Sequence, residues 1–437
     1  MSAHRFILIS YLLIILFGTI LLYLPISTKE SISLMDAFFT SASATTVTGL
    51  IVVDTEKTFT PFGKFIILVL IQMGGLGYMV FTTYFLISFR KRISLRDRII
   101  LSEAMDYPGM HGLIRFLKRT IPLVFFIEFI GALLLFPSFL FYSKNPAESL
   151  AMSIFHSISA FNNAGFSTLS SNLVPFKGDL LVNLVVSVLI ILGGLGLYVL
   201  YEIILYYRKE VSRLSTHTKL VIATSGILIA VGFVAMLIDF YKWNDLSLKE
   251  KLLASLFHSI SARTAGFNSV DISKLSEASL FWLIILMFIG ASPGGTGGGI
   301  KTTTAAVILI SVISYIRGKG LVVVFGRRLT EEVINKAMVI LSLSFAYTTF
   351  ATLLLAELEG EKLLPTLFEV VSAFSTVGLS VGTPEGLSLS ASFSPLGKLI
   401  IIITMLMGRI GILSFMFAIY GKREESRIRP PEARVLL

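Results

Sequence analysis

Cysteine is absent from the 437 residues, and charged residues make up only 15% of them. Without cysteine the chain can form no disulfide, thiolate metal site or cysteine nucleophile. The low charge excludes an ordinary soluble domain, in which about a quarter of the residues are charged. No Ser/His/Asp set, catalytic carboxylate pair or metal-ligand cluster stands out, so we expect neither an enzyme nor a bound cofactor.

Apolar residues dominate the composition instead. Hydrophobic residues account for 54% of the chain, and the mean hydropathy is +0.84. Apolar runs of the roughly 20 residues needed to cross a bilayer recur along the chain. The composition therefore predicts an all-α integral membrane protein with several spanning helices.

The net charge of +10 follows the expected topology. Lys and Arg concentrate in the connectors near residues 90–119, 208–219 and 317–336 and in the tail from residue 422, which alternate spans would place on one side. The positive-inside rule assigns this side, with both termini, to the cytoplasm of a multi-pass protein in the cell membrane. We expect the basic residues to meet membrane lipids and not nucleic acid.

Four short segments of the chain resemble one another. Each has an apolar stretch, then small or hydroxyl residues, then a glycine followed by Leu or Phe. They are FFTSASATTVTGL, FHSISAFNNAGF, FHSISARTAGF and FEVVSAFSTVGL, with the glycines Gly49, Gly165, Gly266 and Gly378. Glycine clusters follow at a nearly constant distance, starting at Gly74, Gly193, Gly294 and Gly408. Two markers that recur in phase predict four tandem units.

Each unit is predicted to contain a spanning helix, a short half-helix that ends in a glycine-bearing loop, and a second spanning helix. The units cover residues 1–90, 91–210, 211–320 and 321–437, the last with a cytoplasmic tail. The first helices are expected near 6–24, 120–142, 220–240 and 333–355. The second helices are expected near 62–89, 180–207, 279–316 and 395–420, with an interruption only in the third. These helices give eight spans.

Four irregular loops at membrane depth point to a pore. Such backbone persists only where protein covers it or where it lines a watery cavity. Loops in pseudo-fourfold order can ring one axis with carbonyl oxygens and replace the hydration shell of a cation. The negative ends of the half-helix dipoles would favour cations there, and glycine permits the backbone to turn its carbonyls inward.

The loops TTVTGL, NNAGF, RTAGF and STVGL resemble the filter loops of the Trk/Ktr/HKT superfamily of potassium transporters, over nearly the whole chain. Eight spans resemble the Ktr-type membrane subunit more than the ten-span Trk form. The resemblance implies potassium uptake, with K⁺ at the carbonyls of the four glycines. The implied filter residues are Val47, Thr48, Gly49, Leu50, Asn163, Ala164, Gly165, Phe166, Thr264, Ala265, Gly266, Phe267, Val377, Gly378 and Leu379.

The same resemblance implies the partners. A Ktr-type membrane subunit forms a homodimer and sits on a cytosolic ring of nucleotide-binding RCK subunits that controls its gate. This chain contains no such domain, so nucleotide control would come from a separate chain. Activation by Na⁺ is a further expectation of the family that no residue of this sequence supports by itself.

The stretch ASPGGTGGGIKTTT interrupts the second helix of the third unit, because its proline and glycines cannot hold a continuous helix. The GxxxxGK[ST] spacing of a phosphate-binding loop fails, since Ile300 separates Gly299 from Lys301. The family resemblance implies an intramembrane gating loop below the filter. The implied gate comprises Ala291, Ser292, Pro293, Gly294, Gly295, Thr296, Gly297, Gly298, Gly299, Ile300, Lys301, Thr302, Thr303, Thr304 and Arg409.

Arg409 takes the place that Gly75, Gly194 and Gly295 have in the other units. An intramembrane arginine needs partners. We expect Arg409 to donate hydrogen bonds to the loop and to oppose cations until the gate moves, with Lys301 acting in the same way.

Several polar residues admit two interpretations. His156 and His258 occupy equivalent places, which favours a hydrogen bond in helix packing over metal binding. Glu128 either pairs with a neighbouring helix or serves transport. Arg263 either tunes cation access or forms a salt bridge behind the filter.

Other small and acidic residues have structural interpretations. Asp36 and Glu369 are expected to cap half-helices. The GGLG clusters that start at Gly74 and Gly193 are consistent with close helix packing as well as with a pore.

Two other classes of function remain open. A secondary transporter of a small solute would place its site at broken helices near the midplane, but its repeats are usually two and inverted. A non-conducting membrane anchor would leave the four loop glycines without a purpose.

Overall fold

The computed structural model describes residues 3–77, 80, 83, 99–102, 112–383 and 386–421. The segment predicted as the first unit contains α1 (Ala3–Tyr23), α2 (Leu34–Thr45), α3 (Thr55–Thr58) and α4 (Pro61–Leu76). The second contains α7 (Leu113–Ser143), α8 (Pro146–Phe161), η1 (Val174–Phe176), α9 (Leu180–Leu195) and α10 (Leu197–Tyr207).

The third segment contains α11 (Thr216–Phe240), α12 (Leu248–Ser261), η2 (Ile272–Lys274), α13 (Glu277–Phe288) and α14 (Thr302–Ile316). A two-stranded antiparallel hairpin follows, with β1 (Val323–Val324) paired to β2 (Arg327–Arg328). The fourth contains α15 (Glu331–Glu359), α16 (Leu363–Phe374), η3 (Leu389–Ala391), α17 (Pro395–Ile410) and α18 (Ile412–Tyr420).

The four predicted first helices are present as α1, α7, α11 and α15, each beginning before its expected start. All four are long and apolar enough to cross a membrane. Among the described residues this number rises to six if the bent pairs α9–α10 and α17–α18 each count as one span. Many of their large apolar side chains, such as Phe17 and Phe129, are exposed, as lipid-facing residues would be.

The second helices are not continuous, and the prediction that only the third is interrupted was wrong. α9 and α10 meet at 97°, and α17 and α18 meet at 104°. The breaks lie at Gly196 (φ +96°) and Gly411 (φ +88°), and α4 ends before Gly77 (φ +81°). Positive φ leaves the helical region, which glycine allows at little cost. Most of the predicted helix beyond residue 77 lies outside the described residues, as do most of the basic connector 90–119 and the tail from residue 422.

Side-chain hydrogen bonds cap three of the four half-helices, whereas α16 has no side-chain cap. Asn145 and Ser247 accept hydrogen bonds from the first backbone N–H groups of α8 and α12, and Ser247 forms a capping box with Glu250. Ser33 caps α2, and Asp36 in its first turn accepts from the Ser33 hydroxyl and from Lys398 at 2.8 Å. Asp36 therefore supports the cap but is not the capping residue itself.

Equivalent glycines pack the first helices against the other two helices in three units. A Cβ at Gly18, Gly131 or Gly232 would overlap a half-helix serine and a second-helix leucine. Those leucines are Leu70, Leu189 and Leu286. Gly74 and Gly193 follow their leucines by four residues, so the counterpart in the third unit is Gly290. The predicted equivalence of Gly294 was wrong, and Ala291, not Gly295, corresponds to Arg409.

The close packing expected of the GGLG clusters is present. A Cβ at Gly74 would overlap the carbonyl oxygen of Thr45, and one at Gly193 that of Phe161. Gly408 meets the carbonyl of Phe374 in the same way. The second helices thus approach the C-terminal ends of the half-helices so closely that no side chain fits.

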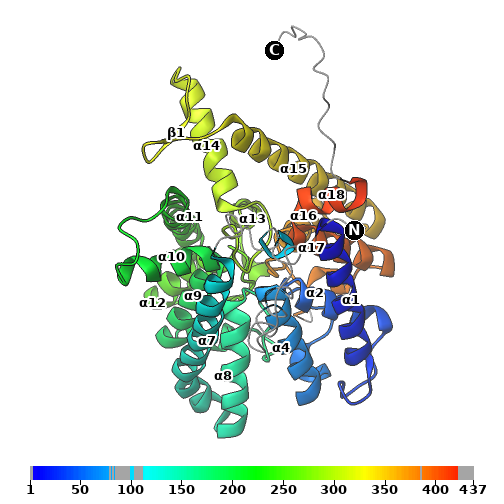
Figure 1. Ribbon diagram of the computed structural model, residues 1–437. Coiled ribbons are helices and arrows are strands. Elements are labelled where there is room, and N and C mark those ends of the chain that lie inside the picture. Colours follow the sequence, from blue (N-terminus) through cyan, green and yellow to red (C-terminus); the bar gives the residue numbers. More distant parts are fainter. Residues whose placement is uncertain are drawn as a thin grey trace.

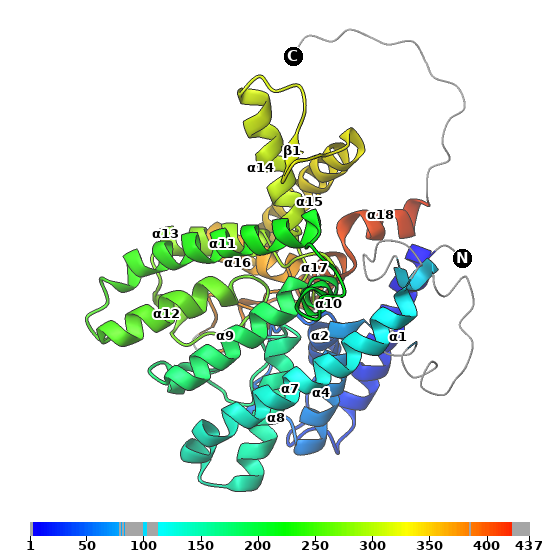
Figure 2. The same ribbon diagram turned by 60° about the vertical axis from the view of Figure 1, so that its left-hand side comes forward.

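One part of the chain stands apart from the helical body. α14, the β1–β2 hairpin and the beginning of α15 project from one side in both views (Figure 1, Figure 2). The hairpin carries Arg327 and Arg328, both exposed. The C-terminal ends of the half-helices and the loops that follow lie inside the body, where Phe161, Phe267 and Phe374 are almost completely buried.

Candidate functional site

The four loop glycines lie in a closed ring. A Cβ added at any of them would meet the carbonyl oxygen of the residue before the next loop's glycine. The pairs are Gly49 with Ala164, Gly165 with Ala265, Gly266 with Val377, and Gly378 with Thr48. The order of contacts follows the order of the loops in the chain and returns to the first. Four backbone segments far apart in sequence therefore meet without room for a side chain.

Each loop has a second residue with positive φ, two positions before the glycine. The φ angles are +59° at Val47, +57° at Asn163, +77° at Thr264 and +50° at Thr376. This conformation is rare for non-glycine residues, above all for β-branched ones. Strained backbone of this kind persists only where the surroundings enforce it, and it clusters at functional sites.

A serine of each half-helix holds the loop that follows it. Ser43 and Ser372 accept hydrogen bonds from the N–H groups of Gly49 (3.1 Å) and Gly378 (3.0 Å). Ser159 donates to the carbonyl of Phe166 at 2.8 Å, and Ser261 donates to that of Phe267 at 2.5 Å. These serines are buried, so the bonds are shielded from competing water.

All of the predicted filter residues belong to these four loops, and the structure brings the loops together. One residue of the same class was missed. Thr376 occupies the position of Val47, Asn163 and Thr264, all of which were predicted, and it forms part of the motif STVGL. Strict alignment of the four motifs on their glycines would have found it.

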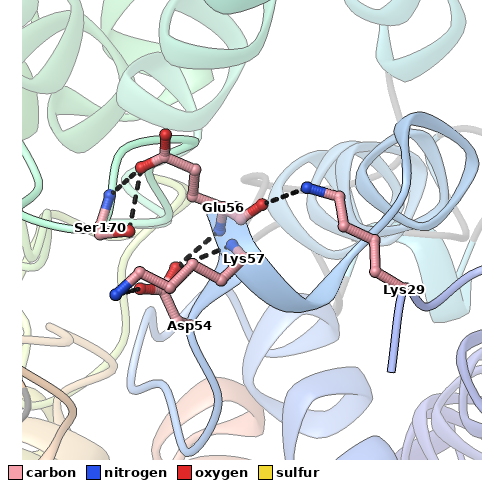
Figure 3. Close-up of polar contacts among 5 residues, drawn as sticks. All are labelled: Lys29, Asp54, Glu56, Lys57 and Ser170. Atoms are coloured by element: carbon pink, nitrogen blue, oxygen red, sulfur yellow. Dashed lines mark hydrogen bonds and ion pairs between the residues drawn. The ribbon is translucent and has the colours of Figure 1, made fainter. Parts of the chain in front are cut away.

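Figure 3 shows how the segments after the first two loops are joined. The carboxylate of Glu56 accepts from the N–H (2.7 Å) and hydroxyl (2.9 Å) of Ser170. Lys29 donates to the backbone carbonyl of Glu56 at 3.0 Å. Asp54 caps α3 through the N–H groups of Glu56 and Lys57. A short helix beside the first loop is thereby fastened to the second unit.

Two further junctions connect neighbouring loops. The N–H of Leu173 donates to the carbonyl of Asn268 at 3.1 Å, which joins the second loop to the third. The backbone of Ser388 donates to the carbonyl of Ile51 at 3.0 Å, and the Ser388 hydroxyl accepts from the Ile51 N–H at 2.9 Å. The first loop is therefore joined to the fourth as well as to the second.

The glycine-rich stretch between α13 and α14 lies against the break in the second unit. Ser292 N–H donates to the carbonyl of Gly194 at 3.0 Å, and Thr296 N–H donates to that of Gly193 at 3.2 Å. Leu197 returns a hydrogen bond to the carbonyl of Gly294 at 3.1 Å. The stretch is thus an ordered loop held by backbone hydrogen bonds from another unit.

Arg409 bridges three units. The expected hydrogen bond to the loop is present, and it is accompanied by bonds to the first unit that were not predicted. From α17 Arg409 donates to the carbonyls of Thr296 in the loop and of Gly74, and to that of Gly75 at 2.8 Å. Lys301 donates to the carbonyl of Gly297 at 2.7 Å. Both predicted cations therefore bind carbonyl oxygens of the loop.

A cavity of about 300 Å³ opens beside the loop and the helix breaks. Its basic lining residues are Lys301, Lys336 and Arg409, together with the titratable His4 and Tyr11, and none of the described lining residues is acidic. Thr296 and Gly411 also line it. A cation that enters this cavity meets a positive field unless the basic groups move or are neutralised.

Glu128 of α7 is buried in a polar network with neighbouring helices. Gln72 donates to one carboxylate oxygen at 3.1 Å, and Asn162 donates to the other at 3.0 Å. Ser157 donates to the backbone carbonyl of Glu128 at 2.6 Å. This supports the pairing interpretation of Glu128.

We expect Glu128→Ala to lower the free energy of unfolding by about 2 kcal/mol, because two buried amide donors lose their acceptor. Glu128→Gln keeps an acceptor oxygen and should unfold within a few degrees of wild type in detergent. Its cation uptake should also equal that of wild type. Normal unfolding with abolished uptake in Glu128→Gln would assign the carboxylate to transport instead.

The two histidines pack as predicted at one site and in part at the other. His156 contacts the carbonyl of Met152 at 2.8 Å and the hydroxyl of Ser167 at 2.9 Å. His258 contacts the carbonyl of Ala254 at 2.9 Å. No group of three potential metal-binding residues lies among the described part of the chain.

Glu369 does not cap its half-helix, so that prediction was wrong. It lies within α16, fully buried, and accepts from Ser380 at 2.6 Å and from the backbone of Ser390 at 2.9 Å. Counted back from the loop glycine, it takes the place of His156. A buried side chain that fastens the segment after the loop is therefore used in both units, with different chemistry.

Arg263 is buried beside α11, where its guanidinium donates to the hydroxyl of Ser225 at 3.1 Å and to its carbonyl at 3.4 Å. The salt bridge considered for this residue is not among the ion pairs of the described residues.

Comparison with known proteins identifies the family of this chain. Residues 2–426 match the TrkH family, described as cation transport proteins. This chain belongs to the TrkH family. It is 41% identical to the Ktr system potassium uptake protein B of Bacillus subtilis, over 98% of this chain and 95% of that protein. The corresponding protein of Vibrio alginolyticus is 38% identical over 99% and 94% of the two chains.

A further relative and a solved structure extend the comparison. The potassium/sodium uptake protein NtpJ of Enterococcus hirae is 35% identical over 100% of this chain and 97% of its own. The crystal structure of the potassium transporter TrkH from Vibrio parahaemolyticus superposes with a TM-score of 0.71 at 21% identity, covering 93% of this chain and 84% of that one. The resemblance to the Trk/Ktr superfamily is confirmed. The expectation that this chain is not an enzyme is also confirmed, because the family consists of transport proteins.

Proposed function

We propose that this chain takes up K⁺ through a single pore formed by its four glycine loops. The observation that carries the proposal is the closed ring in which each loop glycine faces a carbonyl of the next loop. A ring of backbone carbonyls is the means by which proteins replace the water around a monovalent cation. The four units and eight spans then form a pseudo-fourfold arrangement around that axis.

The cation supported best is potassium. The Bacillus and Vibrio relatives are named potassium uptake proteins, and the Enterococcus relative a potassium/sodium uptake protein. Glycine in all four loops favours potassium within the family. Since the four loops are unequal, the rings of carbonyls are imperfect, and discrimination against Na⁺ or Rb⁺ should be weaker than in a symmetric channel.

The intramembrane loop acts as the gate in this proposal. Residues 291–304 lie beside the filter loops and beside a positive cavity, and Arg409 fastens them to the first and fourth units. Movement of the loop would withdraw both the obstruction and part of the positive field. The basic side of the protein, with both termini, faces the cytoplasm.

The names of the Ktr relatives bear on the assembly of this chain. The Ktr names support a membrane subunit that acts with a separate regulatory chain. We propose a homodimer on a cytosolic nucleotide-binding RCK ring, with Na⁺ as a further activator. The second candidate function is a secondary transporter, favoured by the broken second helices, which resemble the discontinuous helices of such proteins.

Uptake of ⁸⁶Rb⁺ into proteoliposomes that contain this chain alone tests the proposal. We expect excess unlabelled K⁺ to suppress uptake far more than the same concentration of Na⁺. Equal suppression by the two ions would contradict a potassium filter. No uptake, even after removal of Gly297, Gly298 and Gly299 from the loop, would favour the solute transporter.

A further inference from the structure

The tip of the intramembrane loop touches the third and fourth filter loops. A Cβ at Gly297 would overlap the hydroxyl of Thr264. One at Gly298 would lie 2.7 Å from the hydroxyl of Thr376, and one at Gly299 would lie 2.8 Å from that of Ser375. Three successive glycines thus allow the loop backbone to contact the filter loops, because any side chain at these positions would overlap them.

A direct hydrogen bond crosses this contact. The N–H of Gly298 donates to the hydroxyl oxygen of Thr376 at 2.8 Å, and both groups are buried. Thr376 has a φ of +50° and lies two residues before Gly378. The carbonyl of the next residue, Val377, faces Gly266 in the ring. A shift of Thr376 would therefore move a carbonyl of the ring.

The equivalent positions in the other loops are occupied differently. Asn163 and Thr264 are within 3.1 Å of each other and form a side-chain pair between the second and third loops. Val47 in the first loop has no hydroxyl, yet its φ is +59°. The first loop shows that a valine fits this backbone conformation. The bond to the intramembrane loop is made by Thr376 of the fourth.

We infer that Thr376 is a positioning residue that couples the intramembrane loop to the fourth filter loop, so that ion selectivity changes with the state of the gate. The inference rests on the proposed filter and gate. When the loop leaves the pathway, Thr376 loses the Gly298 N–H, and a strained residue is held by one contact fewer. By linkage, ions in the filter change the position of the loop in return.

Thr376→Val removes the acceptor with little change in shape, and Thr376→Ser keeps it. In ⁸⁶Rb⁺ uptake by proteoliposomes we expect Thr376→Val to raise uptake about five-fold, the effect of one buried hydrogen bond. In the same variant, the ratio of the suppression of ⁸⁶Rb⁺ uptake by K⁺ to its suppression by Na⁺ should fall. Thr376→Ser should restore the wild-type competition ratio. If Thr376→Val is not recovered folded, Thr376→Ala also lacks the hydroxyl and serves the same test.

A double-variant cycle separates coupling from a purely structural role. In a chain without Gly297, Gly298 and Gly299, Thr376→Val should change neither uptake nor competition further. An undiminished effect in that chain, or a Thr376→Val protein equal to wild type in both measurements, would overturn the inference. Failure of the proposed function looks different, because the wild-type chain itself would then show no preference for K⁺ as competitor.

Discussion

Gly49→Ser is expected to reduce the preference for K⁺ over Na⁺ by at least about ten-fold, a loss of ~1.4 kcal/mol in relative ion binding. The new Cβ would overlap the carbonyl oxygen of Ala164, and Gly49 has a φ of +91°, which serine resists. The first and second loops must separate, and the carbonyl ring widens. Competition of K⁺ and Na⁺ with ⁸⁶Rb⁺ uptake measures the effect.

Two glycines outside the ring provide matched controls. Gly226 lies in α11 with no atom within 4 Å of its added Cβ, so Gly226→Ser tests the substitution alone. Gly360 has a φ of +67° and equally open surroundings, so Gly360→Ser adds backbone strain without overlap. Both should retain the wild-type preference for K⁺. A Gly49→Ser protein with an unaltered preference would remove the first loop from the filter.

Arg409→Gln should raise ⁸⁶Rb⁺ uptake by the chain alone about 10- to 100-fold. A hydrogen bond from a charged group to a buried carbonyl contributes about 1.5–3 kcal/mol, and this substitution loses the bond to Thr296 together with the positive charge. Loss of the bond and loss of the charge both favour the state in which the loop has moved out of the ion pathway. The measurement is initial uptake per folded protein, with the regulatory chain absent.

Arg409→Lys distinguishes the two causes. Lysine keeps the charge but does not reproduce the planar fork that reaches Thr296, Gly74 and Gly75 together. If the bridge between units holds the gate, Arg409→Lys should increase uptake nearly as much as Arg409→Gln. Wild-type uptake in Arg409→Lys would show that charge alone closes the pathway, and unchanged uptake in both variants would exclude Arg409 from the gate.

The repeat of four glycine motifs predicted the loops because each must meet the same demand, a backbone that approaches another without a side chain. The breaks at Gly196 and Gly411 were missed because the clusters GGLG and GRIG stand in apolar runs, where glycine is tolerated within a helix. Only the positive φ at those residues distinguishes a bend of 97° or 104° from a straight span. At Gly196 the bend is accompanied by backbone contacts to the glycine-rich stretch of the third unit, whereas an added Cβ at Gly411 meets no atom within 4 Å.

The register of the third unit shows a different limit. A stretch as rich in glycine as residues 291–304 matches a glycine marker at several offsets, so Gly294 aligned as well as Gly290. The contact of Gly232 with Leu286 resolves the alignment in space. Likewise, Glu369 and His156 share a position but not a chemistry, and nothing in residue type relates a carboxylate to an imidazole.

The closed ring of loops has a genetic consequence. In a homotetramer one codon change alters four positions at once, and an intermediate with a single altered position exists only in mixed assemblies. Here Gly49, Gly165, Gly266 and Gly378 are encoded separately. Because all four loops belong to one chain, a single mutation changes one loop and leaves the sequences of the other three unchanged. In the proposed filter, selection can therefore change one loop at a time, although each change also displaces the neighbouring loop whose carbonyl faces the altered glycine.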